Sequence, residues 1–337
     1  MHAPGARFDP LRGRWVIVAP ARAQRPAEPG TGGRAPPGCA FCAGHEDRTP
    51  PEVARAGPGP PDEPGWRVRV FPNRFPVVAG GPAASSGDGD RDRGGDDPLR
   101  RGSPARGRHE VVVLSPDHHR SLGSLDEAAV VEVLTVVRDR ARAHAAEGLA
   151  YSQAFVNHGP AAGASLEHPH AQIVAAGVPP SVLLEEAARI SPGGRCTICA
   201  EIDRLGDDPE LLVAGGDAVL WCPWWAGSDY EMLLAPRRHR PRFEDAGAEL
   251  GAVAAVLGDG LRRVDVALGG PPYNLAVHSR PAGVGTDGHW HVHIWPRLQR
   301  EAGFERATGV LIATVDPAGA AQVLRAAGTA LPSQPAP

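Results

Sequence analysis

Two stretches of this chain repeat the same landmarks in the same order, and the repetition limits which folds the chain can adopt. Residues 110–118 (EVVVLSPDH) and 231–239 (EMLLAPRRH) each place an apolar run and a proline before a histidine. Farther along, HPHAQI at 168–173 corresponds to HWHVHI at 289–294. Each half also begins with its own C-x-x-C pair. Matching landmarks in the same order indicate a tandem duplication.

The spacing of the histidines supports this interpretation. In the first half 40 residues separate His118 from His158, and in the second half 39 residues separate His239 from His278. Each interval is long enough for one helix and one strand. The two halves are therefore expected to share one order of secondary structure.

The predicted elements favour an α+β fold. The first long helix begins with a capping box at Ser124 and Glu127. We expect two tandem histidine-triad-like repeats, 1–180 and 181–330, whose antiparallel sheets are flanked by helices and joined side by side. Residues 79–108 are charged and low in complexity and predict a disordered loop. Strands are expected at 15–19, 67–70, 109–114, 150–157 and 167–174, and a second helix at 181–190.

Composition excludes several classes of protein. The net charge is −4, with 35 basic and 39 acidic residues, so a nucleic-acid partner is not expected. The chain has no apolar run of about 18 residues and no signal-like N-terminus, which predicts a cytoplasmic protein without a membrane partner. All the basic residues are arginines. Any bound phosphate must therefore be held by arginine, backbone N–H groups, histidine or amide side chains.

The stretch 167–174 alternates as a strand would. Successive side chains of a strand point to opposite faces, so His168, His170 and Gln172 share one face. Burying two imidazoles and an amide on one face costs free energy unless each has a partner. A polar strand face satisfied by water would be the simplest interpretation of one such histidine, but the other histidines and cysteines of the chain favour a site.

The cysteines predict metal binding. Four of the five cysteines form two C-x-x-C pairs, which in a reducing compartment indicate a metal site before a disulfide. Two added histidines would complete a closed, tetrahedral Cys₂His₂ zinc site. Spacing alone does not distinguish His118 from His119 as the ligand. In the second half His239 matches His118 and Arg240 matches His119, so the repeat favours His118. The predicted first site is Cys39, Cys42, His118 and His168.

The same rule predicts a second site in the second half. Its ligands would be Cys196, Cys199, His239 and His289, and it could hold zinc or iron. His291 and His293 offer other ligand choices there. Solvated cysteines without a metal remain the alternative for both pairs, because C-x-x-C alone is common.

His170 is the candidate nucleophile. If His168 binds metal, His170 faces the same side and is available for chemistry. A neutral imidazole attacks phosphorus well near pH 7 when its other nitrogen donates to a backbone carbonyl. Gln172 can donate to a phosphoryl oxygen, and Ser165 with Gly159 and Gly163 can add donors from the preceding loop. These residues predict nucleotidyl transfer through a covalent histidine intermediate.

Motifs along nearly the whole chain now point to a known family. The chain resembles the galactose-1-phosphate uridylyltransferase family, a branch of the histidine triad superfamily. The H-P-H-x-Q motif in this context is highly specific for that family. The segments that carry the resemblance are RFDPLRGRWVIVAPARAQRP at 7–26, CAFC at 39–42, RVFPNRFPVV at 69–78, SPDH at 115–118, FVNHGPAAGASLEHPHAQI at 155–173 and HWHVHIWPRL at 289–298.

The resemblance implies a ping-pong reaction. His170 would attack the α-phosphate of UDP-glucose, release glucose 1-phosphate and pass the uridylyl group to galactose 1-phosphate. It also implies that His118, rather than its neighbour, binds zinc, that the sheets form antiparallel half-barrels, and that the protein is a homodimer. The residues that match family positions near nucleotide or phosphate are Arg22, Arg25, Asn73, Asn157, Ser165 and Gln172.

The chain departs from the best-known bacterial type in two ways. The second metal site of that type would map to Glu186, His278, His291 and His293, but the chain also has CTIC at 196–199, as in the branch related to ADP-glucose phosphorylase. The segment 302–315 (AGFERATGVLIATV) resembles that branch too and lacks the Tyr-Glu pair that the other uses for the hexose. The chemistry is thus better defined than the sugar and the base.

Three alternatives follow from the sequence. One is an ADP-glucose phosphorylase or adenylyltransferase that uses the same histidine. Another is a histidine triad nucleotide hydrolase built from His289, His291 and His293 in the second half. The third, a non-enzymatic zinc-stapled binding module, leaves His170 and Gln172 without a purpose.

Overall fold

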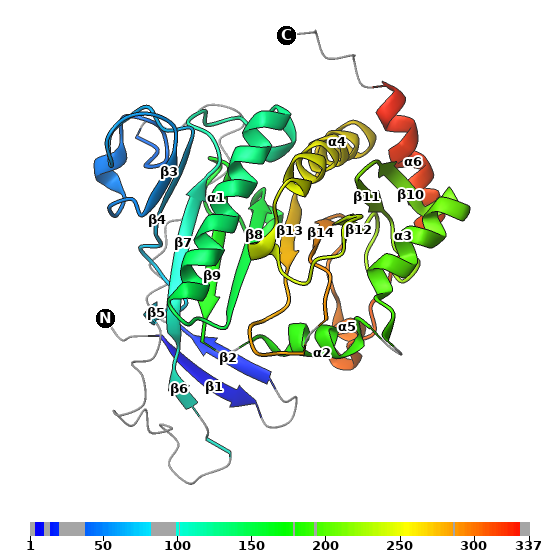
Figure 1. Ribbon diagram of the computed structural model, residues 1–337, viewed down its shortest axis with the longest axis horizontal. Helices are drawn as coiled ribbons and strands as arrows, with labels where there is room; N and C mark the ends of the chain where they lie inside the picture. Colours follow the sequence, from blue (N-terminus) through cyan, green and yellow to red (C-terminus); the bar gives the residue numbers. More distant parts are fainter. Residues whose placement is uncertain are drawn as a thin grey trace.

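Most strands of both halves lie in one sheet, with helices packed against it (Figure 1). Within the part of the chain described here, no helix has the length and apolar character needed to cross a bilayer. The structure is a computed structural model, and it describes residues 4–9, 14–19, 38–81, 99–100, 102–177, 179–191, 194–285 and 287–330.

The first half contributes most of the strands and one long helix. These elements are β1 (Gly5–Asp9), β2 (Arg14–Val18), β3 (Ala54–Ala56), β4 (Val68–Pro72), β5 (Ala79–Gly80), β6 (Gly102–Pro104), β7 (Arg106–Val113), α1 (Glu127–Ala146), β8 (Tyr151–His158) and β9 (His170–Ala176).

The second half repeats the order of a strand, a long helix and two further strands. Its elements are α2 (Ser181–Arg189), α3 (Thr197–Asp207), β10 (Leu212–Gly215), β11 (Ala218–Trp221), β12 (Met232–Pro236), α4 (Glu249–Leu268), β13 (Tyr273–His278), β14 (His291–Pro296), α5 (Gly303–Thr308) and α6 (Pro317–Ala330).

The predicted α+β fold is confirmed as one open sheet of 11 strands. Its order is β10-β11-β12-β14-β13-β8-β9-β7-β4-β3, with β5 beside β7, and β1, β2 and β6 form a separate three-stranded sheet. The trio β7-β9-β8 of the first half is matched by β12-β14-β13 of the second. The two trios join where β8 pairs antiparallel with β13, Val156 opposite Leu275. The two halves therefore share one continuous sheet.

Helices α1 and α4 cover one face of this sheet and lie side by side in Figure 1. The main apolar core lies between them and the strands, and Val112, Ala171 and Ile173 belong to it. Full burial of an isoleucine such as Ile173 contributes about 1.5–3 kcal/mol. A one-residue slip of β9 would expose Ile173 and bury Gln172 among the helices, so the core fixes the register of the strand.

Two predicted boundaries were wrong in detail. The cap of α1 is Asp126, whose carboxylate accepts a hydrogen bond from the backbone N–H of Ala129, while Ser124 ends a short 3-10 turn. Both residues are good caps, and the turn places only Asp126 at the helix entrance. Strand β9 begins at His170, so His168 lies just before the strand rather than within it.

Both ends of the predicted loop 79–108 form strands instead. Ala79 and Gly80 form β5, which pairs in parallel with β7, and residues 102–104 form β6, which pairs with β1. A polar composition signals disorder locally, but pairing with strands distant in the sequence satisfies these backbone groups. Residues 82–98 and 101 lie outside the described residues.

Glu110 ties β7 to α1 on the helix side of the sheet. Its carboxylate accepts two hydrogen bonds from Arg140, at 2.6 and 2.9 Å, and lies 3.1 Å from Nε2 of His144. Burial alone would raise the pKa of Glu110, but hydrogen bonds from His144 and Arg140 outweigh it and lower the pKa to about 2. The ionised form is therefore the one that the fold stabilises.

Replacing Glu110 by glutamine is expected to lower the free energy of unfolding at pH 7 by about 3 kcal/mol. Because the folded pKa lies below the ordinary pKa of a glutamate, 4.5, this contribution is present above pH 4.5 and is lost as the pH falls towards 2. Urea unfolding at several pH values measures it. The exposed pair of Glu147 with Arg108 provides the control, since Glu147→Gln should change stability by less than about 0.5 kcal/mol. Equal pH dependence in Glu110→Gln and the wild type would contradict this assignment.

Candidate active site and metal clusters

The candidate nucleophile lies on the sheet face opposite α1. Phe71 of β4, Val111 of β7 and Gln172 of β9 are neighbours across three strands and point to the same side. Phe41, from the segment that carries the first cysteine pair, packs edge-on against Phe71 with ring centroids 5.4 Å apart. The segment 38–50 thus covers this face, as the helices cover the other.

The first predicted metal site is assembled as expected from the sequence. Its four ligand atoms lie within 4.8 Å of one another. Sγ of Cys42 is 3.5 Å from Nδ1 of His118 and 3.6 Å from Nδ1 of His168, and Sγ of Cys39 is 3.8 Å from the latter. Metal–sulfur and metal–nitrogen bonds of about 2.3 and 2.0–2.1 Å in a tetrahedral site imply sulfur–nitrogen separations of about 3.6 Å. This cluster could therefore hold a metal ion without rearrangement.

His168 is held in the form that a metal ligand needs. Its Nε2 donates to the carbonyl oxygen of Ser115 at 2.9 Å, so the lone pair is on Nδ1, which faces the cysteines. Burial, against a smaller opposing effect of the Ser115 hydrogen bond, lowers the pKa of His168 to about 4. The ring is neutral near pH 7, as coordination requires.

His170 has the geometry of a nucleophile. Its Nδ1 donates to the carbonyl oxygen of His168 at 2.9 Å, which leaves the lone pair on Nε2. The ring is buried and stands edge-on to Phe41, with centroids 5.3 Å apart. The backbone hydrogen bond therefore fixes both the tautomer and the direction of the imidazole.

A cavity of about 280 Å³ adjoins this histidine. It brings together four residues of the predicted site, Asn73, Ser165, His170 and Gln172, with Arg48 and Arg74, which the sequence interpretation missed. The sequence signal for them was the absence of lysine, which leaves arginine as the cationic side chain available to bind phosphate.

Asn157 does not line this cavity. Its Oδ1 accepts a hydrogen bond at 2.8 Å from Asn274, where β8 meets β13. The predicted phosphate ligands Arg22 and Arg25 lie outside the described residues.

His109 is another residue that the sequence interpretation missed. It is buried on β7, and its Nε2 lies 2.9 Å from Oε1 of Gln172. The repeat could not have identified it, because Tyr230 stands at the matching place in the second half. The sequence signal for His109 was its position immediately before Glu110, at the start of a repeated segment.

The second predicted site is also assembled. Sγ of Cys199 lies 3.4 Å from Nδ1 of His239 and 3.5 Å from Nδ1 of His289, and Sγ of Cys196 lies 3.7 Å from the latter. As in the first half, the buried histidine donates from Nε2 to a carbonyl oxygen, here that of Pro236, at 2.8 Å. The site differs in that Asp287, 2.9 Å from Nε2 of His239, orients the more exposed imidazole.

A third cluster joins Glu186 of α2 to His278, His291 and His293. Nδ1 of His278 lies 2.8 Å from the Glu186 carboxylate. Nδ1 of His291 donates to the carbonyl oxygen of His289, as His170 does to that of His168. Burial and then the neighbouring His293 lower the pKa of His291 to about 3. All four side chains could thus act as ligands of one metal ion.

Comparison with known proteins identifies this class of fold. The crystal structure of an ADP-glucose phosphorylase from Arabidopsis thaliana with bound ADP-glucose matches the chain with a TM-score of 0.73 at 27% identity, covering 96% of this chain and 99% of that one. The fold is therefore shared with enzymes that bind sugar nucleotides.

The sequence comparisons define the family. Residues 1–180 match the family described as galactose-1-phosphate uridyl transferase, N-terminal domain. The ADP-glucose phosphorylase of A. thaliana is 30% identical over 96% of this chain and 93% of its own length. The galactose-1-phosphate uridylyltransferase of Haemophilus influenzae is 29% identical over 89% of this chain and 85% of its own. The chain belongs to the galactose-1-phosphate uridyl transferase family.

Proposed function

We propose that the chain is a nucleotidyltransferase that exchanges UMP between UDP-glucose and galactose 1-phosphate through a covalent uridylyl-His170. The observation that carries this proposal is the orientation of His170, whose Nδ1 donates to a backbone carbonyl while the ring borders a cavity. The neighbouring Gln172, Ser165 and Asn73 supply polar groups on the walls of that cavity. Arg48 and Arg74 supply positive charge for phosphate.

The reaction has two displacements at one phosphorus atom. The lone pair on Nε2 of His170 forms the N–P bond with the α-phosphorus, and the P–O bond to glucose 1-phosphate breaks, so that glucose 1-phosphate leaves with the electron pair. A phosphate oxygen of galactose 1-phosphate then attacks the same phosphorus, and the N–P bond breaks. The amide of Gln172 carries no acidic proton, so it can donate to a phosphoryl oxygen without protonating the intermediate.

We assign zinc to the two cysteine–histidine clusters. Thiolate and imidazole ligands in a closed tetrahedron are typical of structural zinc, which stabilises the fold and takes no part in the chemistry. The third cluster offers three imidazoles and one carboxylate, a set that suits iron or zinc. In the first half the metal would anchor the segment 38–50 over His170.

Phosphorolysis of ADP-glucose is the second candidate function. The assembled cluster of Cys196, Cys199, His239 and His289 favours it, as does the similarity to the A. thaliana phosphorylase over nearly the whole chain. In that reaction His170 would carry an adenylyl group and inorganic phosphate would be the acceptor. The chemistry at His170 is the same in both candidates, and only the base and the acceptor differ.

A substrate panel distinguishes the two. Purified protein is incubated with UDP-glucose or ADP-glucose at equal concentration, each with galactose 1-phosphate or with phosphate, and the products are separated by ion-exchange chromatography. The uridylyltransferase predicts UDP-galactose as the main product, at a rate at least about tenfold above that of any ADP-glucose reaction, a selectivity of about 1.4 kcal/mol. Preferential formation of ADP and glucose 1-phosphate would instead establish the second candidate. Turnover of neither sugar nucleotide would contradict both.

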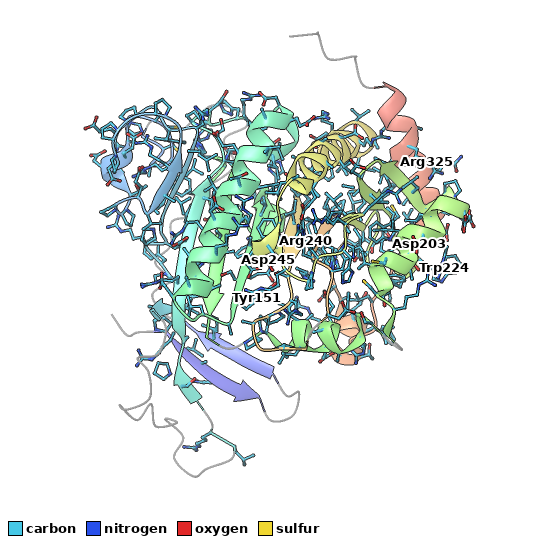
Figure 2. All side chains as sticks on the ribbon, viewed as in Figure 1. Tyr151, Asp203, Trp224, Arg240, Asp245 and Arg325 are labelled. Atoms are coloured by element: carbon cyan, nitrogen blue, oxygen red, sulfur yellow. The ribbon has the colours of Figure 1, made fainter. Side chains whose placement is uncertain are left out.

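We also propose a cytoplasmic homodimer. Apolar side chains of the second half are exposed, including Trp224, Phe304 and Leu311. Figure 2 shows Trp224 at the outer edge of the molecule. An interface between subunits would remove such side chains from water. Light scattering of protein eluting from a size-exclusion column, loaded at several concentrations, measures the mass in solution. A homodimer predicts twice the mass of one chain, and the mass of a single chain would contradict it.

A further inference from the structure

We infer that His109 is a positioning residue that turns the amide of Gln172 so that its NH₂ group, and not its oxygen, faces the reacting phosphoryl group. This inference rests on the proposed function. His109 is buried, is not the nucleophile, and is a member of none of the three clusters that could hold a metal ion. Three observations carry it: the register of two strands, the hydrogen bonds of the His109 ring, and the matching residues of the second half.

The register brings His109 and Gln172 together. In the antiparallel pair of β7 and β9, Val111 lies opposite Gln172 and His109 lies opposite Val174. His109 is therefore a diagonal neighbour of Gln172 on the same face, within reach for a side chain of this length. The measured separation between His109 Nε2 and Gln172 Oε1 is 2.9 Å.

The backbone determines which ring nitrogen of His109 carries the proton. The N–H of Val77 points at Nδ1 over 3.1 Å, and a backbone N–H can only donate. Nδ1 is therefore the acceptor, and the proton of the neutral ring is on Nε2. It follows that Nε2 donates to Oε1 of Gln172, which fixes the amide and directs its NH₂ group away from His109.

The amide of Asn73 does not supply the acceptor for this proton. Nδ2 of Asn73 lies 3.1 Å from Nε2 of His109, while its Oδ1 accepts from the backbone N–H of Phe75 at 2.8 Å. Both nitrogens are then donors, so this contact is not a hydrogen bond. The Nε2 proton is directed at Oε1 of Gln172, 2.9 Å away.

The second half lacks both members of the pair. Tyr230 stands where the first half has His109, and His293 stands where it has Gln172. His293 belongs to the cluster with Glu186, and Nε2 of His291 lies 3.1 Å from it. The half with the nucleophile beside a cavity thus has both His109 and Gln172, whereas the half with the third cluster has neither.

The chemical consequence concerns the charge on the phosphoryl oxygens. An amide that could rotate would turn its oxygen towards a phosphoryl oxygen for part of the time. The two oxygens both carry negative charge and repel each other. A fixed NH₂ donor stabilises negative charge in the transition state without reorganisation. Removing one such preorganised donor costs about 10²–10³-fold in kcat elsewhere, so disordering it is expected to cost about 10–100-fold here.

The test compares His109→Leu, His109→Gln and Gln172→Ala, with the double variant His109→Leu/Gln172→Ala. The readout is the single-turnover rate of nucleotidyl labelling of His170 by α-³²P-labelled UDP-glucose or ADP-glucose, whichever labels the wild type. We expect His109→Leu to lower the rate about 10–100-fold at saturation with KM changed less than about threefold, and His109→Gln, whose NH₂ can still donate, to keep it within about fivefold. The double variant should be no slower than Gln172→Ala, because His109 acts only through Gln172.

The matched control is Tyr230→Phe, at the corresponding position of the second half, which should leave the labelling rate unchanged. A second measurement does not depend on activity: ¹⁵N spectra of histidine-labelled wild type, assigned by the signals that His109→Gln lacks, should show His109 protonated on Nε2. Protonation on Nδ1, additive losses in the double variant, or full activity of His109→Leu would each overturn the inference. A wild type that labels no histidine contradicts the proposed function instead, and the spectra still decide the orientation.

Discussion

Replacing His170 by asparagine is expected to abolish nucleotidyl transfer, with a fall in kcat of about 10⁴-fold or more. Asparagine preserves a polar side chain of similar size but cannot form the N–P bond. The position of His168, and with it the first cysteine–histidine cluster, should be unchanged because His170 bonds to the backbone carbonyl of His168 and not to a ligand atom of its ring. Quench of a reaction with α-³²P-labelled sugar nucleotide, followed by peptide mapping, should find the label on His170 in the wild type and nowhere in His170→Asn.

His291→Asn is the matched control for this experiment. His291 occupies the corresponding position in the second half, and its Nδ1 makes the same kind of hydrogen bond, to the carbonyl of His289. Its ring, however, is buried beside Glu186 as a member of the third cluster. We expect His291→Asn to keep most of the labelling. If His291→Asn loses turnover while His170→Asn keeps it, the reaction belongs to the second half, as in a histidine triad hydrolase.

Replacing Cys42 by alanine is expected to remove one equivalent of zinc and to lower the melting temperature by roughly 10 °C, the result of losing about 3 kcal/mol or more. Cys42 is the natural target because its sulfur lies within 3.6 Å of both His118 and His168. Without the metal, the buried imidazole of His168 would lose its partner, and the segment that holds Phe41 against His170 would lose its anchor. Labelling of His170 should fall together with the metal content.

Cys222→Ala provides the control for this second prediction. Cys222 is a buried core cysteine that belongs to neither cluster, so its replacement should leave the metal content unchanged. Metal is measured by plasma emission spectrometry on protein purified without added metal, and stability by calorimetry. A Cys42→Ala protein with the full metal content and an unchanged melting temperature would exclude a structural metal in the first cluster.

The fold and much of the site follow from local patterns in the sequence. Alternation along a strand places His170 and Gln172 on one face and Ile173 on the other, and the structure has this arrangement. The repeat separated His118 from His119 as the partner of Cys42, because Arg240 occupies the second position in the other half. Such inferences succeed because periodicity and duplication are properties of the chain itself.

The N-terminus of the first helix shows where local patterns stop. Ser124 and Asp126 are both good caps, and the sequence favoured Ser124 because Glu127 follows three residues later. The structure uses Asp126, because a 3-10 turn packed in the core precedes the helix and sets its entry. The strand pairs formed by residues 79–80 and 102–104 were missed for a related reason, since their partners are distant in the sequence.

The sequence by itself determined the duplication, the members of both cysteine–histidine clusters and the shared face of His170 and Gln172. Only the tertiary structure decided that both halves form one sheet through β8 and β13, and that His109 forms a hydrogen bond with Gln172. The physical reason is that a diagonal contact between strands depends on their register, which is set by burial of the whole core rather than by any local pattern. The protonated nitrogen of His109 is likewise chosen by the N–H of Val77, a partner that no spacing in the sequence indicates.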